Sequence, residues 1–420
     1  MRKRTKGQNP KRTRISNARN ILNLCRRGTA LSRADIARTL GLSHPASSAI
    51  VRELVQAGYL EVKAKRRGAI GSPSNLYGIA PDAAFSFGIN IGRRSVQAVM
   101  LDLNCNVVRS ETIPYDIPRV NVIMEYIRER ISTWISEFAE VRQDRVIGIG
   151  ICSPKYFGFR GEELGYPAWI AKEWTKFDPR GLFEDWHDFP VFEANDANAA
   201  ALAENEIGLG KSVENFFYVF IGTFIGGGLI LDGDLLPGPQ GLAANYGPFP
   251  VTPSRLSSVE KNPDGFESLV RRASVYGLIR HMQSGGAPVT RVSDLAGLDE
   301  KFRYLIDEWQ HDASDAIMQS IVGIASIIDV EAVIIDGALP TNLLAAVVAE
   351  IRALMREHPD RYLVVPELHT GEVGDQARAV GAAIVPFARR IWSTSDDTSE
   401  PDVDPADGSQ TLPFLAGSAG

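Results

Sequence analysis

Residues 32–60 read SRADIARTLGLSHPASSAIVRELVQAGYL, and this stretch predicts two helices joined by a tight turn. Ser32 followed by Asp35 is the pattern of a capping box, which opens a short helix. Gly41 supplies the turn, and Ser43 then caps a second helix. Two helices joined by a short turn that contains glycine are typical of a DNA-binding helix-turn-helix.

The sequence on either side of this stretch completes a winged helix. Residues 15–27 carry apolar side chains at helical spacing and predict a first helix. Residues 60–79 predict two short strands around a basic, glycine-rich tip, which would be the wing. The alternative is a small helical domain whose basic residues only solvate its surface. We predict a winged helix-turn-helix over residues 15–80, preceded by a basic arm at 1–14.

The distribution of charge supports a nucleic-acid partner. The chain has 420 residues and a net charge of −6, which by itself argues against DNA binding. Residues 1–80, however, contain 17 Lys and Arg against three Asp and Glu, a net charge of +14. The rest of the chain therefore carries −20. Such asymmetry favours a basic module that binds a polyanion, attached to an acidic body.

Cysteine content and hydropathy suggest where the protein works. The three cysteines are far apart and odd in number, so they imply no disulfide framework. The basic first residues are not followed by the apolar segment of a signal peptide, and no run of 18 apolar residues occurs. We expect a cytoplasmic protein without a membrane partner.

From residue 85 the pattern changes to that of an α/β body. Three consecutive strands, a helix at 121–140 and a strand at 146–152 are followed by a second block of the same kind, which ends in a strand at 332–338. This repetition predicts two related lobes that face a cleft. We place the smaller lobe at 81–198 plus about 375–392, and the larger lobe at 199–374.

The segment 393–420 differs from the body in composition. It contains six acidic residues, no Lys or Arg, and several Pro, Gly and Ser. This composition predicts a disordered acidic tail.

Several stretches of the body together resemble one family. They are FGINIGRRSVQAVMLDLN (87–104), VIGIGICSP (146–154), VFEANDANAAALAE (191–204), IGTFIGGGLILDGD (221–234) and GDQARAVGAAIV (374–385). In combination with the winged helix they resemble the ROK family, named for repressors, open reading frames and sugar kinases. The resemblance implies a two-lobed body of the actin and hexokinase type, which is ribonuclease H-like.

The resemblance also implies where a sugar kinase would carry its chemistry, and this chain departs from that pattern. The early turn that normally presents an Asp to Mg²⁺ has Asn90, followed by Arg93 and Arg94. The second glycine-rich turn has Phe224 in place of a small residue. Loss of charge and of small residues at both turns argues against phosphoryl transfer. A rearranged anion site around the arginines is the alternative to a plain structural turn.

The positions that grip a sugar are only partly kept. The resemblance implies that Asp196 matches the general base of the kinases and that Asn195 matches a sugar contact. Both residues are also natural caps for the helix that follows. The next sugar-binding element begins with Asn245 in place of Glu and has Pro248 in place of His. The resemblance also implies that Glu267 corresponds to a further sugar-contacting Glu.

We expect no metal and no cofactor. The cysteine cluster that binds zinc in the family is missing, since residues 249–268 contain neither Cys nor His. The six histidines of the chain do not cluster in sequence. A structural zinc site needs four closely spaced Cys or His ligands.

The DNA-contacting residues follow from helix-turn-helix geometry. The first turns of the second helix of the motif enter the major groove, so His44, Ala46, Ser47 and Ser48 are expected to face base edges. Basic residues nearby are expected to hold phosphates or an adjacent minor groove. They are Arg33 and Arg52, Lys11, Arg12 and Arg14 in the arm, and Lys65, Arg66 and Arg67 in the wing.

The sequence therefore predicts a DNA-binding transcriptional regulator, in the first instance a repressor, with a catalytically inactive effector body. The resemblance implies a homodimer or homotetramer on a palindromic operator. The altered cleft binds a sugar, a non-sugar effector or nothing, and the sequence leaves these open. Two rival functions remain: an active sugar kinase with a DNA-binding head, and an architectural DNA binder without a ligand.

Overall fold

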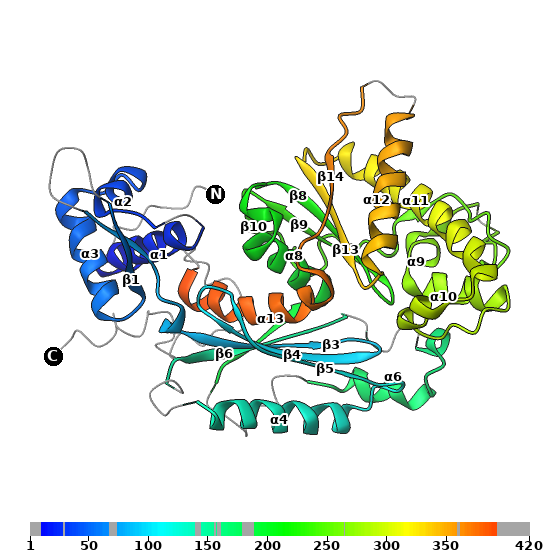
Figure 1. Cartoon of the computed structure of the whole chain (residues 1–420), viewed down its shortest axis with the longest axis horizontal. Helices are drawn as coiled ribbons and strands as arrows, with labels where there is room; N and C mark the ends of the chain where they lie inside the picture. The colour runs from blue at the N-terminus through cyan, green and yellow to red at the C-terminus, as the bar shows by residue number, and fades with distance from the viewer. Residues whose placement is uncertain are drawn as a thin grey trace.

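A computed structural model describes residues 10–27, 30–66, 74–138, 144–154, 157, 161–178, 189–263, 265–358 and 362–392. The predicted arm before Pro10, the wing tip at 67–73 and the predicted acidic tail at 393–420 lie outside these residues. Figure 1 shows a small N-terminal head beside a larger body that is built on two sheets.

The head is a winged helix, as predicted. It comprises α1 (Pro10–Arg27), α2 (Arg33–Thr39), α3 (His44–Gln56), and an antiparallel ribbon of β1 (Leu60–Arg66) and β2 (Ser74–Ile79). Helix α1 begins five residues earlier than the predicted start at residue 15, so residues 10–14 are helical rather than part of a separate arm. Pro10 is compatible with this start because proline is favoured at the first position of a helix.

Local capping fixes the two helices of the motif. The Ser32 hydroxyl accepts a hydrogen bond from the Asp35 N–H at 3.1 Å, and Asp35 accepts one from the Ser32 N–H at 3.2 Å. Ser43 accepts from the Ala46 N–H at 3.3 Å at the start of α3. These bonds satisfy backbone donors that a helix leaves without intrahelical partners. The predicted capping box and cap are therefore confirmed.

The first lobe contains a five-stranded mixed sheet in the order β5-β4-β3-β6-β7. Its strands are β3 (Phe85–Ile91), β4 (Ser95–Asp102), β5 (Val107–Pro114), β6 (Val146–Ser153) and β7 (Val191–Asn195). Helix α4 (Val120–Ser136) packs Ile127 and Ile131 into the core below this sheet, and the short helix α6 (Ala168–Thr175) adds Ile170 and Trp174.

The second lobe repeats this topology with different strands. Its sheet has the order β10-β9-β8-β13-β14, with β8 (Phe216–Ile221), β9 (Ile225–Leu231), β10 (Asp234–Leu235), β13 (Ala332–Gly337) and β14 (Glu367–Thr370). Helices α9 (Leu269–Arg272), α10 (Val275–Ser284), α11 (Arg303–Ala325) and α12 (Thr341–Arg356) form its outer side (Figure 1). A two-stranded ribbon of β11 (Pro250–Val251) and β12 (Glu267–Ser268) lies near α11.

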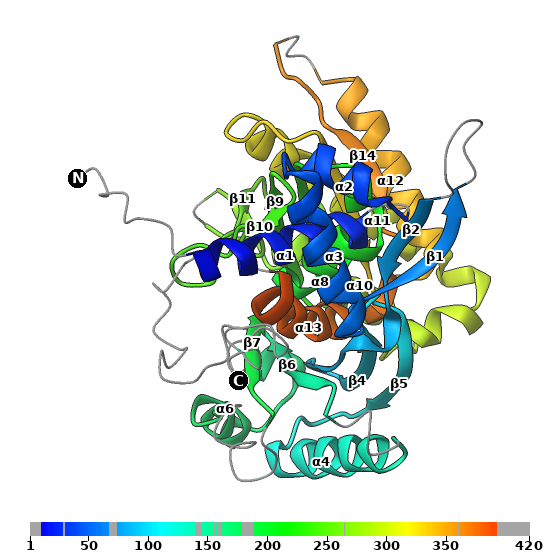
Figure 2. The same cartoon turned by 90° about the vertical axis from the view of Figure 1, so that its left-hand side faces the viewer.

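Two helices form a layer between the sheets. Helix α13 (Ala377–Phe387) packs on β3 and β6, and α8 (Asp196–Ile207) packs on β9 and on α13 (Figures 1 and 2). The helices can approach this closely because Gly381 has no side chain; a Cβ there would overlap the backbone of Ala199. The predicted division of the lobes at residues 198/199 and about 375 stays a prediction.

The head and the body share one hydrophobic core. Ile21, Leu22 and Cys25 of α1 belong to the same buried cluster as Phe387 and Trp392, near the C-terminal end of the described chain. Trp392 ends a π-helical turn, Ala388–Trp392, that continues α13. The head is therefore packed against the body rather than attached by a free linker.

Candidate nucleic-acid interface and ligand cleft

The first turns of α3 are open to solvent. His44 and Ala46 are exposed, Ser48 is half-buried, and Arg52 is exposed two turns further along the helix. The opposite side of α3 packs Ile50, Val51 and Leu54 into the core of the head. The buried side fixes the helix, and the exposed side has the access that a contact with DNA requires.

Ser47 does not share this access, and its predicted contact with base edges is wrong. Its side chain is fully buried, and its hydroxyl donates a hydrogen bond to the Arg33 carbonyl oxygen at 3.2 Å. Residues three and four apart share a face of a helix, so Ser47 lies on the same inner face as Ile50 and Val51. Ser47 holds α3 against α2 instead.

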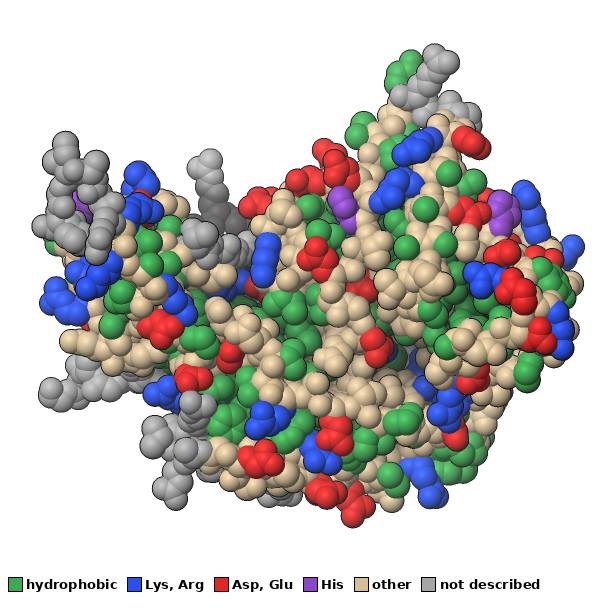
Figure 3. Space-filling view, viewed as in Figure 1, with side chains coloured by type: hydrophobic (Ala, Val, Ile, Leu, Met, Phe, Trp, Pro, Cys, Tyr) green, Lys and Arg blue, Asp and Glu red, His purple; other side chains and the backbone are tan. Residues whose placement is uncertain are grey.

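Basic side chains surround the exposed end of α3. Arg33 lies with its guanidinium 5.2 Å from the centre of the Tyr77 ring in β2, and Lys65 and Arg66 are exposed at the end of β1. Figure 3 shows Lys and Arg side chains gathered over the head, whereas acidic side chains are frequent over the body. The side chains of Lys11 and Arg12, and all of Arg67, lie outside the described residues.

Acidic residues hold some of these arginines in place. Arg66 of the wing lies 3.2 Å from Asp35, which also pairs with Arg38 at 2.8 Å. Arg14 of α1 pairs with Glu53 of α3. The Ser32 hydroxyl and backbone N–H, together with the two arginines, hold the pKa of Asp35 below its usual value. Asp35 therefore stays charged and joins the wing to the start of α2.

The predicted ligand residues of α8 lie at the point where this helix starts. The Asn195 side-chain oxygen accepts from the N–H groups of Ala197 and Asn198 at 3.1 and 3.2 Å, so Asn195 is the cap of α8. Asp196 is half-buried in the first turn, and its carboxylate accepts from the Ala197 N–H at 3.0 Å. The carboxylate also contributes, after burial, to the raised pKa of the Cys152 thiol in β6. Capping is thus shown, and a ligand contact stays a prediction.

Asn90, at the metal position of the resemblance, is buried and bonded within the first lobe. Its amide donates to the Gln97 side-chain oxygen at 3.0 Å, and its own oxygen lies 3.5 Å from the Cys152 sulfur. A neutral amide that is already held in this way provides no carboxylate for a divalent cation.

The two turns that would hold phosphate meet each other across the lobes. Arg93, which follows β3, is 8% exposed and donates to the Phe157 carbonyl oxygen. Its guanidinium carbon lies 5.4 Å from the centre of the Phe157 ring and 4.7 Å from that of Phe224, in the turn between β8 and β9. Phe224 packs against the cores of both lobes and edge-on to Tyr276 of α10. Protein side chains thus fill the space between the turns.

The other two predicted ligand residues are the exposed Asn245 and the buried Glu267. Tyr246, next to the exposed Asn245, packs against Gly227 of β9, while Gly226 packs against Ala197 of α8. Glu267 is 3% exposed in β12, accepts from the Ser268 N–H at 2.8 Å, and lies 3.6 Å from Arg271. Tyr246 and Ala197 thus pack on adjacent glycines of β9, and Glu267 has little open surface for a ligand.

The loop after β11 is held by a buried ion pair. Arg272 of α9 is 2% exposed and pairs with Asp312 of α11 at 2.9 Å. The same guanidinium donates to the Thr252 carbonyl oxygen at 2.9 Å, and Asp312 accepts from the Ser254 hydroxyl at 2.9 Å. No sequence pattern indicated this pairing, because the two charged residues are 40 positions apart.

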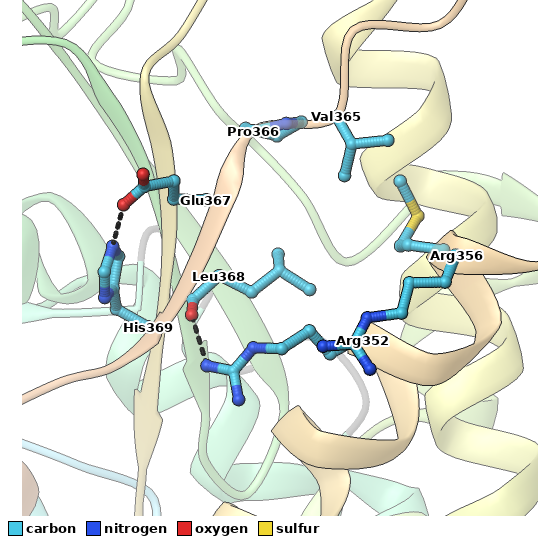
Figure 4. A pocket seen from close by; sticks show the side chains of 8 residues that line it. Arg352, Arg356, Val365, Pro366, Glu367, Leu368 and His369 are labelled. Carbon is cyan, nitrogen blue, oxygen red and sulfur yellow. Dashed lines mark hydrogen bonds and ion pairs between the residues drawn. The ribbon is translucent and has the colours of Figure 1, made fainter. Parts of the chain in front are cut away.

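Two open cavities lie in the second lobe, away from the start of α8. One, of about 570 Å³, is lined by charged residues of α11 and by Arg255 and His281. The other, of about 430 Å³, lies between α12 and β14, with Arg352 donating to the Leu368 carbonyl oxygen at 2.5 Å (Figure 4). Neither is lined by a residue predicted to bind a ligand.

The body and the head each match a known sequence family. Residues 86–388, which include both sheets and the α8–α13 layer, match the sequence model described as ROK family, and residues 15–68 match that of the MarR family. The chain belongs to the ROK family. Its winged-helix head is MarR-like, and its two-lobed body has the actin and hexokinase type of fold, as predicted.

ROK relatives include both repressors and kinases. The chain is 24% identical to the xylose repressor of Bacillus subtilis over 53% of its own length and 56% of the repressor. It is 28% identical to a glucokinase of Halalkalibacterium halodurans over 56% of its own length and 71% of the kinase. In fold it resembles the crystal structure of a ROK family transcriptional regulator, a homologue of the E. coli Mlc protein, with a TM-score of 0.64 at 20% identity over 90% of this chain and 96% of that one.

Two further features, a membrane-spanning helix and a cluster of metal ligands, are absent from the described residues of this ROK chain. None of the described helices is long and apolar enough to cross a bilayer. The same residues contain no group of three or more His, Cys, Asp or Glu side chains that could hold a metal ion.

Proposed function

We propose that this ROK chain is a transcriptional regulator that binds an operator through α3 and the wing. The observation that carries the proposal is the exposed start of α3, where His44 and Ala46 face solvent beside the exposed basic residues Arg52, Lys65 and Arg66. The names of relatives favour a repressor that responds to a sugar. We further propose that it acts in the cytoplasm as a homodimer or homotetramer on palindromic DNA, as the family resemblance implies.

We further propose that the body does not transfer phosphoryl groups. Arg93 and Phe224 occupy the space between the two turns, and the neutral Asn90 stands where a metal-binding carboxylate would be needed. Phosphoryl transfer depends on positioning and on neutralisation of phosphate charge by metal ions. A coupled ATPase assay with xylose, glucose and N-acetylmannosamine is expected to stay at background; turnover above background would support the kinase alternative instead.

Point variants test DNA binding better than deletion of the head. Because α1 shares its core with the body, removal of residues 1–80 would expose the apolar surface around Trp392 and confound the result. We expect Arg52→Ala to weaken binding to the DNA upstream of the gene that encodes this chain. The slope of log affinity against log salt concentration should fall by about 1. Arg303→Ala, which removes an exposed arginine from the body, is the matched control.

A second variant separates base reading from phosphate contact. His44→Ala is expected to relax sequence preference by about 1–3 kcal/mol per operator position while the salt slope stays unchanged. Equal affinity of the parent chain for operator and for scrambled DNA of the same length would contradict a specific regulator. Affinity that neither variant changes would contradict the assignment of α3 as the reading helix.

A sugar effector is tested by linkage. A ligand that binds the folded chain raises its unfolding temperature and, if it is the effector, changes operator affinity. Xylose, glucose and N-acetylmannosamine are the first probes, taken from the names of relatives. No response to a broad panel of sugars and sugar phosphates would favour the architectural DNA binder.

A further inference from the structure

The first helix of the head is fastened to the last described residues of the body. Asn23 of α1 donates its side-chain amide to the Trp392 carbonyl oxygen at 2.8 Å. The Arg26 guanidinium lies 4.3 Å from the centre of the Trp392 ring, and Trp392 is only 4% exposed. These contacts join α1 to the turn that continues α13, and Figures 1 and 2 both show α1 beside that end of α13.

A buried ion pair ties the same arginine to α8. Arg26 pairs with Glu206, and the two side chains are 11% and 7% exposed. Separation of such a pair would leave an uncompensated charge in a poorly solvated place. Movement of the C-terminal turn of α8 is therefore expected to carry α1 with it.

Helix α8 connects this junction to the predicted ligand residues Asn195 and Asp196. Asn195 caps its start, Asp196 lies in its first turn, and Glu206 lies in its last turn. At 1.5 Å per residue, the 12 residues of α8 span about 18 Å. The helix packs on α13 through the close approach of Gly381 to Ala199, one turn after its start, so α8 is held as a stiff element.

The other acid of the last turn fixes α8 to the segment before α13. The Glu204 carboxylate is fully buried and accepts hydrogen bonds from the N–H groups of Leu209, Glu372 and Val373 at 3.0–3.3 Å. The C-terminal end of α8 thus contacts the chain that leads into α13 as well as the head. A shift of this end would therefore act on α1 both through Glu206 and through the turn with Trp392 that continues α13.

We propose that Arg26 and Glu206 are positioning residues for DNA reading, and that α8 transmits displacements from the cleft to the head through this pair. The inference rests on the proposed function and deepens it, because it names the path by which a small polar ligand at the start of α8 changes the orientation of α3. Such a ligand shifts a population only if it binds the two orientations with different affinity.

A substitution that pushes against the start of α8, called the wedge, can replace the unidentified ligand in a test. A Cβ added at Gly226 of β9 would lie 2.8 Å from the Ala197 Cβ, so the first turn of α8 and β9 must move apart. Gly226→Ala is therefore the wedge, placed at the end of α8 that carries Asp196. Gly297→Ala is its control, since a Cβ there meets no heavy atom within 4 Å. Operator affinity is measured by fluorescence anisotropy for two half-sites at several spacings.

The decisive comparison is a double-mutant cycle with the ion pair. In the parent chain we expect the wedge to change operator affinity by about fivefold or more and to shift the preferred half-site spacing. In the Glu206→Gln background the same wedge is expected to change affinity by less than about twofold. Glu300→Gln, which removes an exposed acid elsewhere on the body, should keep the full effect of the wedge. Equal effects of the wedge in the Glu206→Gln and Glu300→Gln backgrounds overturn the inference.

A second background guards against misfolding. Arg26→Met combined with Glu206→Leu removes both charges and keeps apolar volume, so neither partner is left buried and unpaired. This double variant should unfold as cooperatively as the parent chain and lose its response to the wedge. A full response to the wedge in this background contradicts the role of the ion pair.

A readout without DNA separates this inference from the proposed function. Amide hydrogen exchange in α1 is expected to change with Gly226→Ala only when Arg26 and Glu206 are both present, whereas exchange in α4 should stay constant. If the chain binds no specific DNA but α1 responds in this way, the regulator proposal fails and the coupling stands. If DNA binding holds but α1 ignores the wedge, the coupling fails.

Discussion

Arg272 in the second lobe and Arg93 in the first are both buried, yet they contact different kinds of groups. Arg272 pairs with the carboxylates of Asp312 and Asp315 at 2.9 and 2.8 Å, within one lobe. Arg93 donates to a carbonyl oxygen of its own lobe and lies against the Phe224 ring of the other. Separation of Arg272 from its partners would leave the carboxylates of Asp312 and Asp315 without their cation. Phe224 carries no charge, so its movement away from Arg93 leaves no unpaired carboxylate. The second lobe is thus held internally by charge, whereas this contact between the lobes joins a cation to an aromatic ring.

The largest effect is expected inside the second lobe. Arg272→Met leaves Asp312 buried without its cation and should lower the free energy of unfolding by about 3–5 kcal/mol. Chemical denaturation measures this loss. Arg272→Met combined with Asp312→Leu should recover part of it, because no charge is then stranded. A loss below about 1 kcal/mol for the single variant would break the contrast with Arg93.

A smaller coupling is expected between the lobes. Arg93→Ala and Phe224→Ala should show a coupling energy of about 0.5–2 kcal/mol in a double-mutant cycle, since the cation lies over a partly desolvated ring. Phe224→Leu is the control: it keeps apolar volume but loses the aromatic face, so it should lose the coupling. Strictly additive effects of the two alanine variants would show that the rings merely pack beside the arginine.

The pH dependence of stability compares a buried carboxyl group of the second lobe, Asp336 of β13, with a buried neutral amide of the first lobe. Burial raises the pKa of Asp336, although the Gly337 and Gly374 N–H groups and the Tyr218 hydroxyl bond its carboxylate. The folded chain therefore binds this proton more tightly than the unfolded chain, so stability should fall as pH rises from about 4 through the raised pKa.

Asp336→Asn is expected to flatten this fall, with unfolding free energies measured by urea between about pH 4.5 and 8. Part of the slope should remain, because burial also raises the pKa of Glu204. Asn90→Ala in the first lobe removes a neutral buried amide and should leave the pH slope of the parent chain. An unchanged slope in the Asp336→Asn variant would exclude this carboxyl group as its source.

The smallest effect is expected at the exposed edge of the contact between lobes. Arg291 of the second lobe lies 2.5 Å from Asp116 of the first, and their side chains are 52% and 75% exposed. Arg291→Ala should change the free energy of unfolding by less than about 0.5 kcal/mol, and added salt should remove even that difference. A larger effect would mean that the rim, rather than Arg93 and Phe224, holds the lobes together.

Features that depend on neighbours in sequence could be predicted well. The capping box of Ser32 and Asp35, the cap at Ser43, and the strands at 85–91 and 332–337 follow from local patterns. The exception in the head is Ser47, which helix-turn-helix geometry predicts to face DNA but which packs against α2 from the inner face of α3. Helical periodicity places Ser47 with Ile50 and Val51, a signal that was available in the sequence.

Features that depend on distant residues could not be predicted in this way. Arg93 and Phe224 were each recognised as departures from a kinase pattern, but their contact joins turns of different lobes. The pairs Arg26–Glu206 and Arg272–Asp312 join side chains from separate helices, and nothing in the local sequence of either partner indicates the other. Burial of Glu267 likewise follows from the β11–β12 ribbon rather than from its own neighbours.

The contact between α1 and Trp392 also orders events during synthesis. Asn23 and Trp392 are 369 residues apart, so at about 5–20 residues per second the ribosome makes the second partner about 20–70 s after the first. Until then, the face of α1 that later packs on the body has no final partner. A prematurely terminated chain that lacks Trp392 would carry the helices that read DNA without the surface that orients them, so translation must reach the end of the body before the head is fixed.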